Sequence, residues 1–128
     1  MERDQTGPRI LLVDDQVDIT EVFSEILEGF GYQVMVARDG YDAVEMYFKH
    51  RPDLVLMDIS LLSMDGDVAT ERILKKDPNA KILILTSLRG EKVERALRAG
   101  ALGVVNKPIS AMDLVRKIEV TLRGEGFE

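Results

Sequence analysis

Five side chains that could act on phosphate follow short apolar runs at widely spaced points of the chain: Asp14, Asp15, Asp58, Thr86 and Lys107. Two carboxylates about 4 Å apart repel each other by roughly 4 kcal/mol at an effective dielectric of ~20. A hard cation such as Mg²⁺ relieves that repulsion, because it prefers oxygen ligands and keeps water positions for a phosphate. A carboxylate can also attack phosphorus to form an aspartyl phosphate, a transfer that needs mainly positioning and charge neutralisation. The lysine and the hydroxyl could supply those contacts.

For these side chains to meet, the apolar runs must be strands of one sheet. The runs cover residues 10–13, 34–37, 54–57, 82–85 and 103–105. Continuous apolar runs of this length are typical of strands that are buried on both faces of a parallel sheet. Segments with helical period lie between them, which predicts five β-α units with helices on both faces. In such a sheet the active crevice lies beyond the carboxyl ends of the strands, so we expect the five side chains at one rim.

Two of the expected helices have clear sequence signals. The first has apolar residues that repeat at helical spacing and so predict one buried face: Ile19, Val22, Phe23, Ile26, Leu27 and Phe30. The last helix begins after Ser110, which is followed three residues later by Asp113. This capping-box pattern predicts where the helix starts.

The composition is that of one folded domain, with 128 residues and 45% apolar content. The formal net charge of −6 argues against attraction to a nucleic-acid backbone, so no direct nucleic-acid partner is expected. The absence of cysteine excludes disulfides and thiolate metal sites. The apolar runs are too short for a signal peptide or a membrane span, so we expect a cytoplasmic protein without membrane insertion. We expect a domain over residues 9–123, with flexible tails at 1–8 and 124–128.

The same residues, taken in order, resemble the receiver domain of two-component response regulators of the chemotaxis type. The resemblance rests on Asp14-Asp15, Asp58-Ile59, Met64-Asp65-Gly66, Thr86-Ser87, Gly100-Ala101 and Lys107-Pro108. Each short motif alone is a weak signal, whereas the ordered set over nearly the whole chain is highly specific. The resemblance implies a doubly wound (βα)5 α/β fold with three α/β/α layers and the flavodoxin-like strand order 2-1-3-4-5.

The resemblance also implies separate roles for the acidic residues. Asp58 is the expected phosphoacceptor. Asp15, Asp58 and the main-chain carbonyl of Ser60 are the expected direct ligands of Mg²⁺, for which Mn²⁺ can substitute. Asp14 is expected to act on the metal mainly through water.

Around the phosphoryl group, the resemblance implies that Thr86 and Lys107 bind the phosphoryl oxygens. The Lys107-Pro108 peptide is usually cis in the family. Val104 stands where the family commonly has an aromatic residue, three positions before the lysine. A valine has no ring to swing inward on phosphorylation, so the readout on the output surface must be different or weaker.

Two loop positions depart from the family pattern or lie where the family varies. Leu62 replaces a proline that the family commonly has four residues after the phosphoacceptor, which removes a restraint on φ. Leu88 lies two residues after Thr86, where the family tunes the lifetime of the phosphoryl group. Its apolar side chain is expected to restrict the attacking water, which predicts slow dephosphorylation.

The implied partners are a histidine kinase or histidine phosphotransfer protein and a downstream effector. The effector is expected on the surface made by the fourth helix, the fifth strand and the fifth helix. Phosphorylation adds about −1.5 to −2 charge and would shift a two-state equilibrium of that surface. We expect a signal carrier that catalyses only its own phosphorylation and dephosphorylation. A phosphorylation-dependent homodimer stays open, as do the cognate kinase, the pathway and membership in a longer regulator.

Three other functions fit the sequence less well. An aspartyl-phosphate phosphohydrolase would have a D-x-D motif after the first strand, where this chain has adjacent aspartates. An unphosphorylated interaction module would not need every chemical position to be present. A nucleotide-binding protein would need a Gly-rich loop where Asp14-Asp15 stands. His50, the one histidine, is expected to be a favourable charge at a helix end rather than a phosphohistidine.

Overall fold

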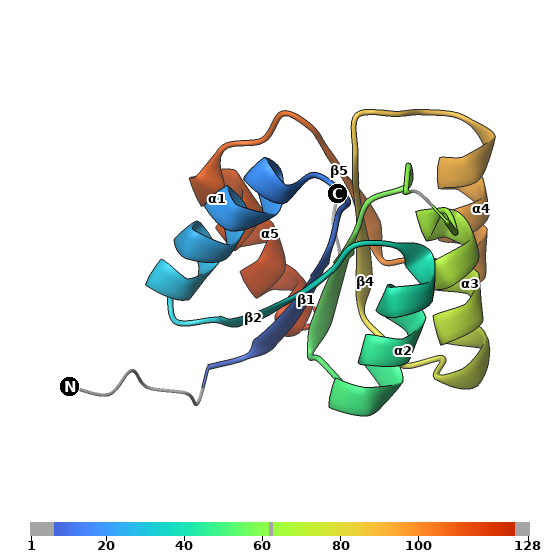
Figure 1. Cartoon of the computed structure of the whole chain (residues 1–128), viewed down its shortest axis with the longest axis horizontal. Helices are drawn as coiled ribbons and strands as arrows, with labels where there is room; N and C mark the ends of the chain where they lie inside the picture. The colour runs from blue at the N-terminus through green and yellow to red at the C-terminus, as the bar shows by residue number, and fades with distance from the viewer. Residues whose placement is uncertain (1–6, 62, 125–128) are drawn as a thin grey trace.

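Parallel strands form the centre of the computed structural model, which describes residues 7–61 and 63–124 (Figure 1). In the described residues the strands are β1 (Arg9–Val13), β2 (Gln33–Ala37), β3 (Leu54–Met57), β4 (Ile82–Thr86) and β5 (Gly103–Asn106). Their order across the sheet is β2-β1-β3-β4-β5, and every neighbouring pair is parallel. The strand order that the resemblance implied is confirmed.

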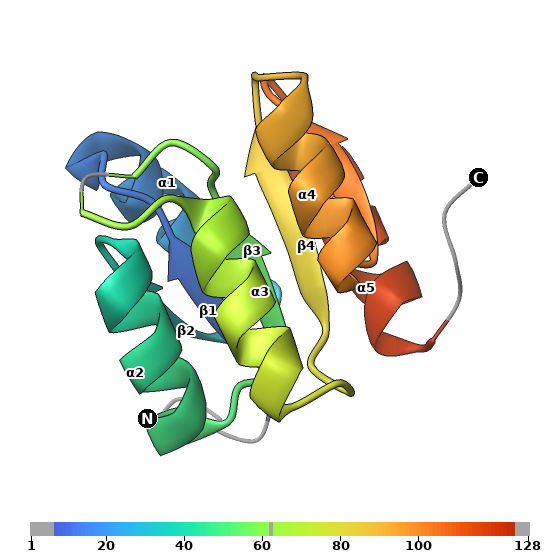
Figure 2. The same cartoon turned by 90° about the vertical axis from the view of Figure 1, so that its right-hand side faces the viewer.

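Helices alternate with these strands along the chain. They are α1 (Val17–Gly29), α2 (Gly40–His50), α3 (Gly66–Lys76), α4 (Glu91–Ala99) and α5 (Ala111–Leu122). α1 and α5 cover one face of the sheet, whereas α2, α3 and α4 stand side by side over the other face (Figures 1 and 2). The structure therefore has the expected three layers, with helices on both faces of a doubly wound sheet.

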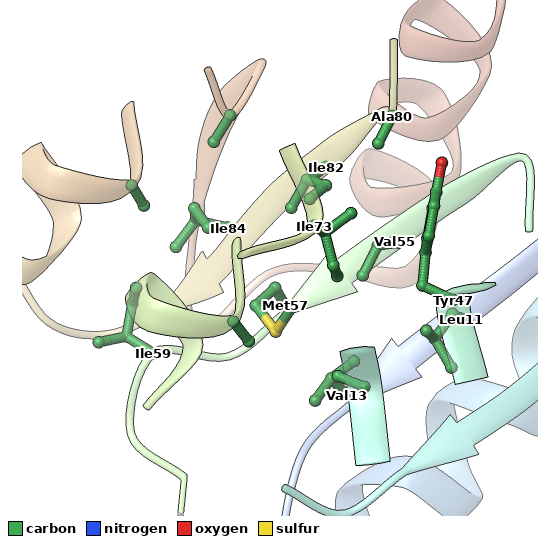
Figure 3. Close-up of a cluster of buried hydrophobic side chains, with 14 of the residues drawn as sticks. Leu11, Val13, Tyr47, Val55, Met57, Ile59, Ile73, Ala80, Ile82 and Ile84 are labelled. Carbon is green, nitrogen blue, oxygen red and sulfur yellow. The ribbon is translucent and has the colours of Figure 1, made fainter. Parts of the chain in front are cut away.

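Two apolar cores lie on the two faces of the sheet. Successive residues of a strand point to opposite faces, so Leu11 belongs to the core under α2, α3 and α4, and Leu12 to the core under α1 and α5. Figure 3 shows the first core, in which Val55 and Met57 of β3 pack beside Ile82 of β4. Each fully buried side chain of this size contributes about 1.5–3 kcal/mol of transfer free energy. The strands are thus a rigid support for whatever follows their carboxyl ends.

The apolar face predicted for the first helix is only partly buried. Leu27 is fully buried, but Val22 is 56% exposed and Phe30 is 51% exposed, so the prediction was wrong for these two residues. Phe30 follows the end of α1 and caps it. Val22 lies about 140° round the helix from Leu27, because each residue turns the helix by ~100°. The buried stripe of α1 is therefore narrower than the sequence pattern.

The predicted start of the last helix is confirmed. Ser110 is the N-cap of α5, and its side-chain oxygen accepts a hydrogen bond from the backbone N–H of Asp113 at 3.1 Å. α2 is capped in the same way, since the Asp39 carboxylate accepts from the N–H of Asp42 at 2.8 Å. Both caps satisfy backbone donors that a helix N-terminus leaves unpaired.

At the amino end of the described chain, Gly7 and Pro8 are joined to β2. The carbonyl of Pro8 accepts from the N–H of Gln33 at 2.9 Å, and the carbonyl of Gly7 accepts from the Gln33 side chain at 2.7 Å. Residues 1–6 and 125–128, which make up most of the expected tails, lie outside the described residues, as does Leu62. Among the described helices, none is long and apolar enough to cross a membrane.

Candidate functional site

The carboxyl ends of four neighbouring strands bring the candidate residues to one rim. Asp14 and Asp15 follow β1, Asp58 follows β3, Thr86 ends β4, and Lys107 follows β5. The register places the last residue of β1 beside the last residue of β3. As a result, carboxylate oxygens of Asp14, Asp15 and Asp58 all lie within 4.8 Å of one another. The structure thus brings together all five side chains that the sequence singled out.

Lys107 lies between two of the three carboxylates. Its Nζ donates to Oδ2 of Asp14 at 3.0 Å and to Oδ2 of Asp58 at 3.4 Å. The Asp14 side chain is only 1% exposed and that of Lys107 is 18% exposed, so the first contact is largely removed from water. Burying a carboxylate is costly unless it is paired. Lys107 is therefore the group that makes a buried Asp14 tolerable.

Asp58 is harder to ionise than an ordinary aspartate. Burial raises the pKa of its carboxyl above the usual value, and the charge of Asp14 adds to that rise. The ammonium of Lys107 and the backbone N–H of Ser60, which donates to the Asp58 carboxylate, act in the opposite direction without cancelling it. Desolvation is thus the dominant influence on this carboxyl. A further positive charge at the rim would favour its ionised form.

The three carboxylates fit a hard divalent cation. All the grouped atoms are carboxylate oxygens, which Mg²⁺ prefers. Asp14 has both oxygens engaged, since Oδ1 accepts from the N–H of Gln16 at 2.9 Å and Oδ2 from Lys107. Asp15, by contrast, is half-buried and makes no side-chain hydrogen bond to the rest of the described chain. Asp15 is therefore more available to a metal than Asp14.

The Thr86 hydroxyl is oriented by the loop that follows it. Its Oγ1 accepts from the backbone N–H of Leu88 at 3.0 Å, and the side chain is buried. Within residues 7–61 and 63–124 the hydroxyl proton has no acceptor of its own. Since a hydroxyl can accept and donate at once, Thr86 keeps a donor for an oxygen in the cavity.

A cavity of about 500 Å³ opens beside these groups. Its polar side includes Asp15, Asp58, Ser60, Thr86 and Lys107. Its other side is apolar and is lined by Ile19, Phe23, Leu88, Pro108 and Ile109. The cavity is larger than a phosphoryl group needs, so the apolar side is available to cover a transferred group or to contact its donor.

The two positions expected to be structural lie on β5 and directly after it. The peptide between Lys107 and Pro108 is cis, as the resemblance implied. Val104 lies within β5, is partly buried, and packs against the core under α2, α3 and α4. The side chain of Val104 is therefore already part of the packed core.

The sequence indicates Asp65 only as part of the Met64-Asp65-Gly66 motif, without a role, and the structure gives it two contacts. Its Oδ1 accepts from the N–H of Leu61 at 3.4 Å, and its Oδ2 accepts from Nζ of Lys92 at 2.6 Å. The next residue, Gly66, packs so closely that an added Cβ would lie 1.9 Å from the carbonyl oxygen of Asp58. In the sequence, Asp65-Gly66 is typical of a turn before a helix. Lys92 is 27 residues away and comes into contact with Asp65 only in the folded chain.

The charged residues of the fourth helix behave as a solvated face with ion pairs. Arg98 binds Glu91 at 2.6 Å, and Arg95 lies 3.4 Å from Glu71 of α3. His50 is in the last turn of α2, which leads into the amino end of β3, so it lies at the edge of the sheet opposite Asp58. His50 takes no part in the rim.

Comparison with known proteins gives one consistent result. The family model described as "Response regulator receiver domain" matches residues 10–119. The chain is 40% identical over 119 residues to the chemotaxis protein CheY of Treponema pallidum, with 90% of this chain and 83% of that protein covered. A CheY-like receiver domain from Methanospirillum hungatei superposes with a TM-score of 0.89 at 32% identity, covering 93% of this chain and 96% of that one.

A third similar structure comes from a complex. CheY of Borrelia burgdorferi was solved with CheX, BeF3 and Mg, and the matched chain has a TM-score of 0.82 at 27% identity. The match covers 88% of this chain and 87% of that one.

Proposed function

Because the chain belongs to the response regulator receiver family, we propose that it is the phosphoacceptor switch of a two-component phosphorelay, with Asp58 as the acceptor. Residues 9–123 would be the working unit, acting in the cytoplasm on a histidine kinase, a histidine phosphotransfer protein or a small phosphodonor. It would carry a signal and catalyse only its own phosphorylation and dephosphorylation. The single observation that carries the proposal is the contact of Lys107 with both Asp14 and Asp58 beside Asp15.

In the proposed reaction, a carboxylate oxygen of Asp58 attacks the phosphorus of the donor. A P–O bond forms, the P–N bond of a phosphohistidine breaks, and the electron pair stays with the imidazole nitrogen, which takes up a proton. Nζ of Lys107 donates to Oδ2 of Asp58 at 3.4 Å. Once the phosphoryl group is attached, this ammonium would donate to a phosphoryl oxygen instead. The free hydroxyl proton of Thr86 would be donated to another phosphoryl oxygen.

Mg²⁺ is the proposed cofactor, with Mn²⁺ as a substitute, and when bound it would neutralise the carboxylates and the phosphoryl oxygens. Asp15, Asp58 and the Ser60 carbonyl would hold it directly. Asp14 would contribute through water, which fits the engagement of both its oxygens by Gln16 and Lys107. The raised pKa of Asp58 supports the need for this charge, since a nearby cation favours the ionised, nucleophilic carboxylate.

The proposed output surface is made by α4, β5 and α5, where phosphorylation would change the affinity for an effector or a second copy of the chain. Val104 is packed in the core and has no ring, so this change would not use an aromatic side chain. The CheX–CheY complex is one case in which a similar chain binds a partner protein in the presence of BeF3 and Mg.

The test is incubation with acetyl phosphate, with Mg²⁺ or with EDTA, followed by intact mass. One phosphoryl group should add to the wild type only with Mg²⁺, and Asp58→Asn should stay unmodified. Asp53→Asn is the matched control, because Asp53 precedes the same strand at its other end and binds the N–H of Arg9. Modification of Asp58→Asn, or equal modification in EDTA, would contradict the proposal. Steady release of phosphate from esters would favour a phosphohydrolase instead.

A further inference from the structure

The Asp65 carboxylate contacts both the loop that follows Asp58 and the first turn of α4. Asp65 is the N-cap residue of α3, yet its side chain makes no capping hydrogen bond. Instead, Oδ1 accepts from the N–H of Leu61 and Oδ2 accepts from Nζ of Lys92. The Lys92 ammonium holds the pKa of Asp65 below its usual value, so the link is charged at neutral pH.

One end of this link lies in the loop that carries the candidate acceptor. Leu61 is buried and lies three residues after Asp58. The N–H of Ser60, next to Leu61, donates to the Asp58 carboxylate. The carbonyl of Ile59 accepts from the N–H of Gly66 at 2.8 Å. A shift of the Asp58 carboxylate would therefore move the backbone at Leu61 and at the start of α3.

The other end of the link lies in the first turn of α4. Lys92 reaches Asp65 from that turn, and one turn later Arg95 lies 3.7 Å from Asp67 and 3.4 Å from Glu71 of α3. Two cations of α4 thus face the N-cap carboxylate of Asp65 and two carboxylates of α3. These ion pairs lie beside the apolar contact of the two helices, in which Val93 and Ala96 of α4 pack into the core that Ile73 of α3 also enters.

The charged side chains of Lys92, Arg95, Asp65, Asp67 and Glu71 form a polar seam between α3 and α4. Two buried oxygen atoms of α3, Oδ1 of Asp67 and Oγ1 of Thr70, have no hydrogen-bond partner among the described residues. Buried polar atoms are normally paired, and an unpaired one calls for an explanation. A second pairing of the α4 cations along α3 would supply those partners, which makes two arrangements of the seam physically reasonable.

We propose that Asp65 is a positioning residue that couples the occupancy of the Asp58 site to α4 through Lys92. The coupling rests on the proposed function, because phosphorylation is the event that it transmits. Charge added at Asp58 moves the loop at Ser60 and Leu61. That movement changes the ion pair between Asp65 and Lys92, and with it the position of α4. This route suits a chain whose residue 104 is a packed valine.

Three variants distinguish the loss of the Asp65–Lys92 contact from the loss of an unrelated surface ion pair. Lys92→Gln removes the α4 end. Asp65→Asn also weakens that end, but its amide oxygen can still accept from the N–H of Leu61. Arg98→Gln is the matched control, because Arg98 makes an exposed 2.6 Å pair with Glu91 inside α4 and has no hydrogen bond or ion pair with the described loop residues 58–61 and 63–65. Since exposed pairs contribute little to stability, all three proteins should fold and retain near-wild-type unfolding curves.

The first measurement uses the protein without metal or phosphate. Amide exchange at Leu61, followed by NMR, should speed up at least about threefold in Lys92→Gln, because the freed carboxylate of Asp65 holds that N–H less firmly. Arg98→Gln should leave Leu61 unchanged. Equal Leu61 exchange in Lys92→Gln and the wild type would overturn the link itself.

The second measurement adds beryllofluoride and Mg²⁺. In the wild type, amide shifts should change both beside Asp58 and along α4. In Lys92→Gln and Asp65→Asn the changes beside Asp58 should persist, while those along α4 should fall to about half or less. An undiminished α4 response, or the same loss in Arg98→Gln, would overturn the coupling. If the wild type shows no change beside Asp58, the proposed function itself is contradicted. If it responds there but the α4 changes do not depend on Lys92, only the coupling is contradicted.

Discussion

Nζ of Lys107 lies 3.0 Å from Oδ2 of Asp14, although the two residues are 93 positions apart in the chain. The contact exists because β1 and β5 both end at the same rim, on either side of β3 and β4. It places a buried carboxylate and its counter-charge next to Asp58, the proposed acceptor.

Removal of the Lys107 charge should therefore destabilise the protein. Lys107→Met keeps the length of the side chain but leaves Asp14 buried and uncompensated, at an expected cost of about 3 kcal/mol. Adding Asp14→Asn should recover most of that loss, because the amide can still accept from the N–H of Gln16. Urea unfolding in EDTA measures both values. A loss below about 1 kcal/mol in the single variant would show that Asp14 is better hydrated than its burial indicates.

Removal of the Asp58 charge should have the opposite effect. Because the folded pKa of Asp58 is raised, the folded state binds the proton more tightly than the unfolded chain does. The contribution of Asp58 to stability therefore falls as pH rises from the ordinary aspartate pKa of 3.8 through the raised pKa. In EDTA, Asp58→Asn should be more stable than the wild type at pH 7 and lose that advantage below pH ~3.8. A less stable Asp58→Asn at pH 7 would contradict this account.

The close packing of Gly66 on Asp58 predicts a sharp difference between two glycines. Gly66→Ala would place a Cβ 1.9 Å from the Asp58 carbonyl oxygen, so the start of α3 must shift, at a cost of about 1–3 kcal/mol. Phosphorylation by acetyl phosphate should slow as well. Gly29→Ala, which meets no atom within 4 Å at the end of α1, should be neutral or stabilise by up to about 0.5 kcal/mol. Thermal unfolding of both proteins distinguishes close packing from general intolerance of substitution.

A pH effect is expected at the other end of the sheet, where the Tyr47 hydroxyl donates to Oδ2 of Asp77 at 2.6 Å. Burial, followed by that hydrogen bond, raises the pKa of Tyr47 to about 12. The stabilisation is fully present below the ordinary tyrosine value of 10.0 and is lost as pH rises through about 12.

Tyr47→Phe tests this linkage. At pH 8 it should lose about 1 kcal/mol of stability relative to the wild type, and the difference should shrink between pH ~10 and ~12. Tyr41→Phe, at an exposed position on the same helix, should match the wild type throughout. A constant difference for Tyr47→Phe across this range would mean that the hydroxyl does not titrate as proposed.

Leu88 is predicted to lengthen the life of an aspartyl phosphate. Its side chain lines the cavity beside Thr86 and is 44% exposed, so it can limit the approach of water without filling the site. Purified phosphoprotein should decay over minutes or longer, and Leu88→Asn should decay several-fold faster. Leu97→Asn, on an exposed position of α4, serves as the control. Decay of the wild type within seconds would contradict the prediction.

Local patterns in the chain are enough to predict the order and type of the elements and the residues that end each strand. Apolar runs of strand length and the Ser110 cap are local signals, since each depends on neighbours in the chain. The resemblance supplied the strand order, and parallel topology then required the strand ends to share one rim. Leu27 was correctly expected to be buried for the same local reason.

Which of these side chains touch one another depends on the packing of the whole fold. Contacts between residues tens of positions apart depend on how helices pack on the sheet, which local periodicity does not specify. The exposure of Val22, the pairing of Asp65 with Lys92, and the engagement of both Asp14 oxygens all arise in this way. The position of a charge along the chain identifies a candidate, whereas burial and the nearest opposite charge decide what that candidate can do.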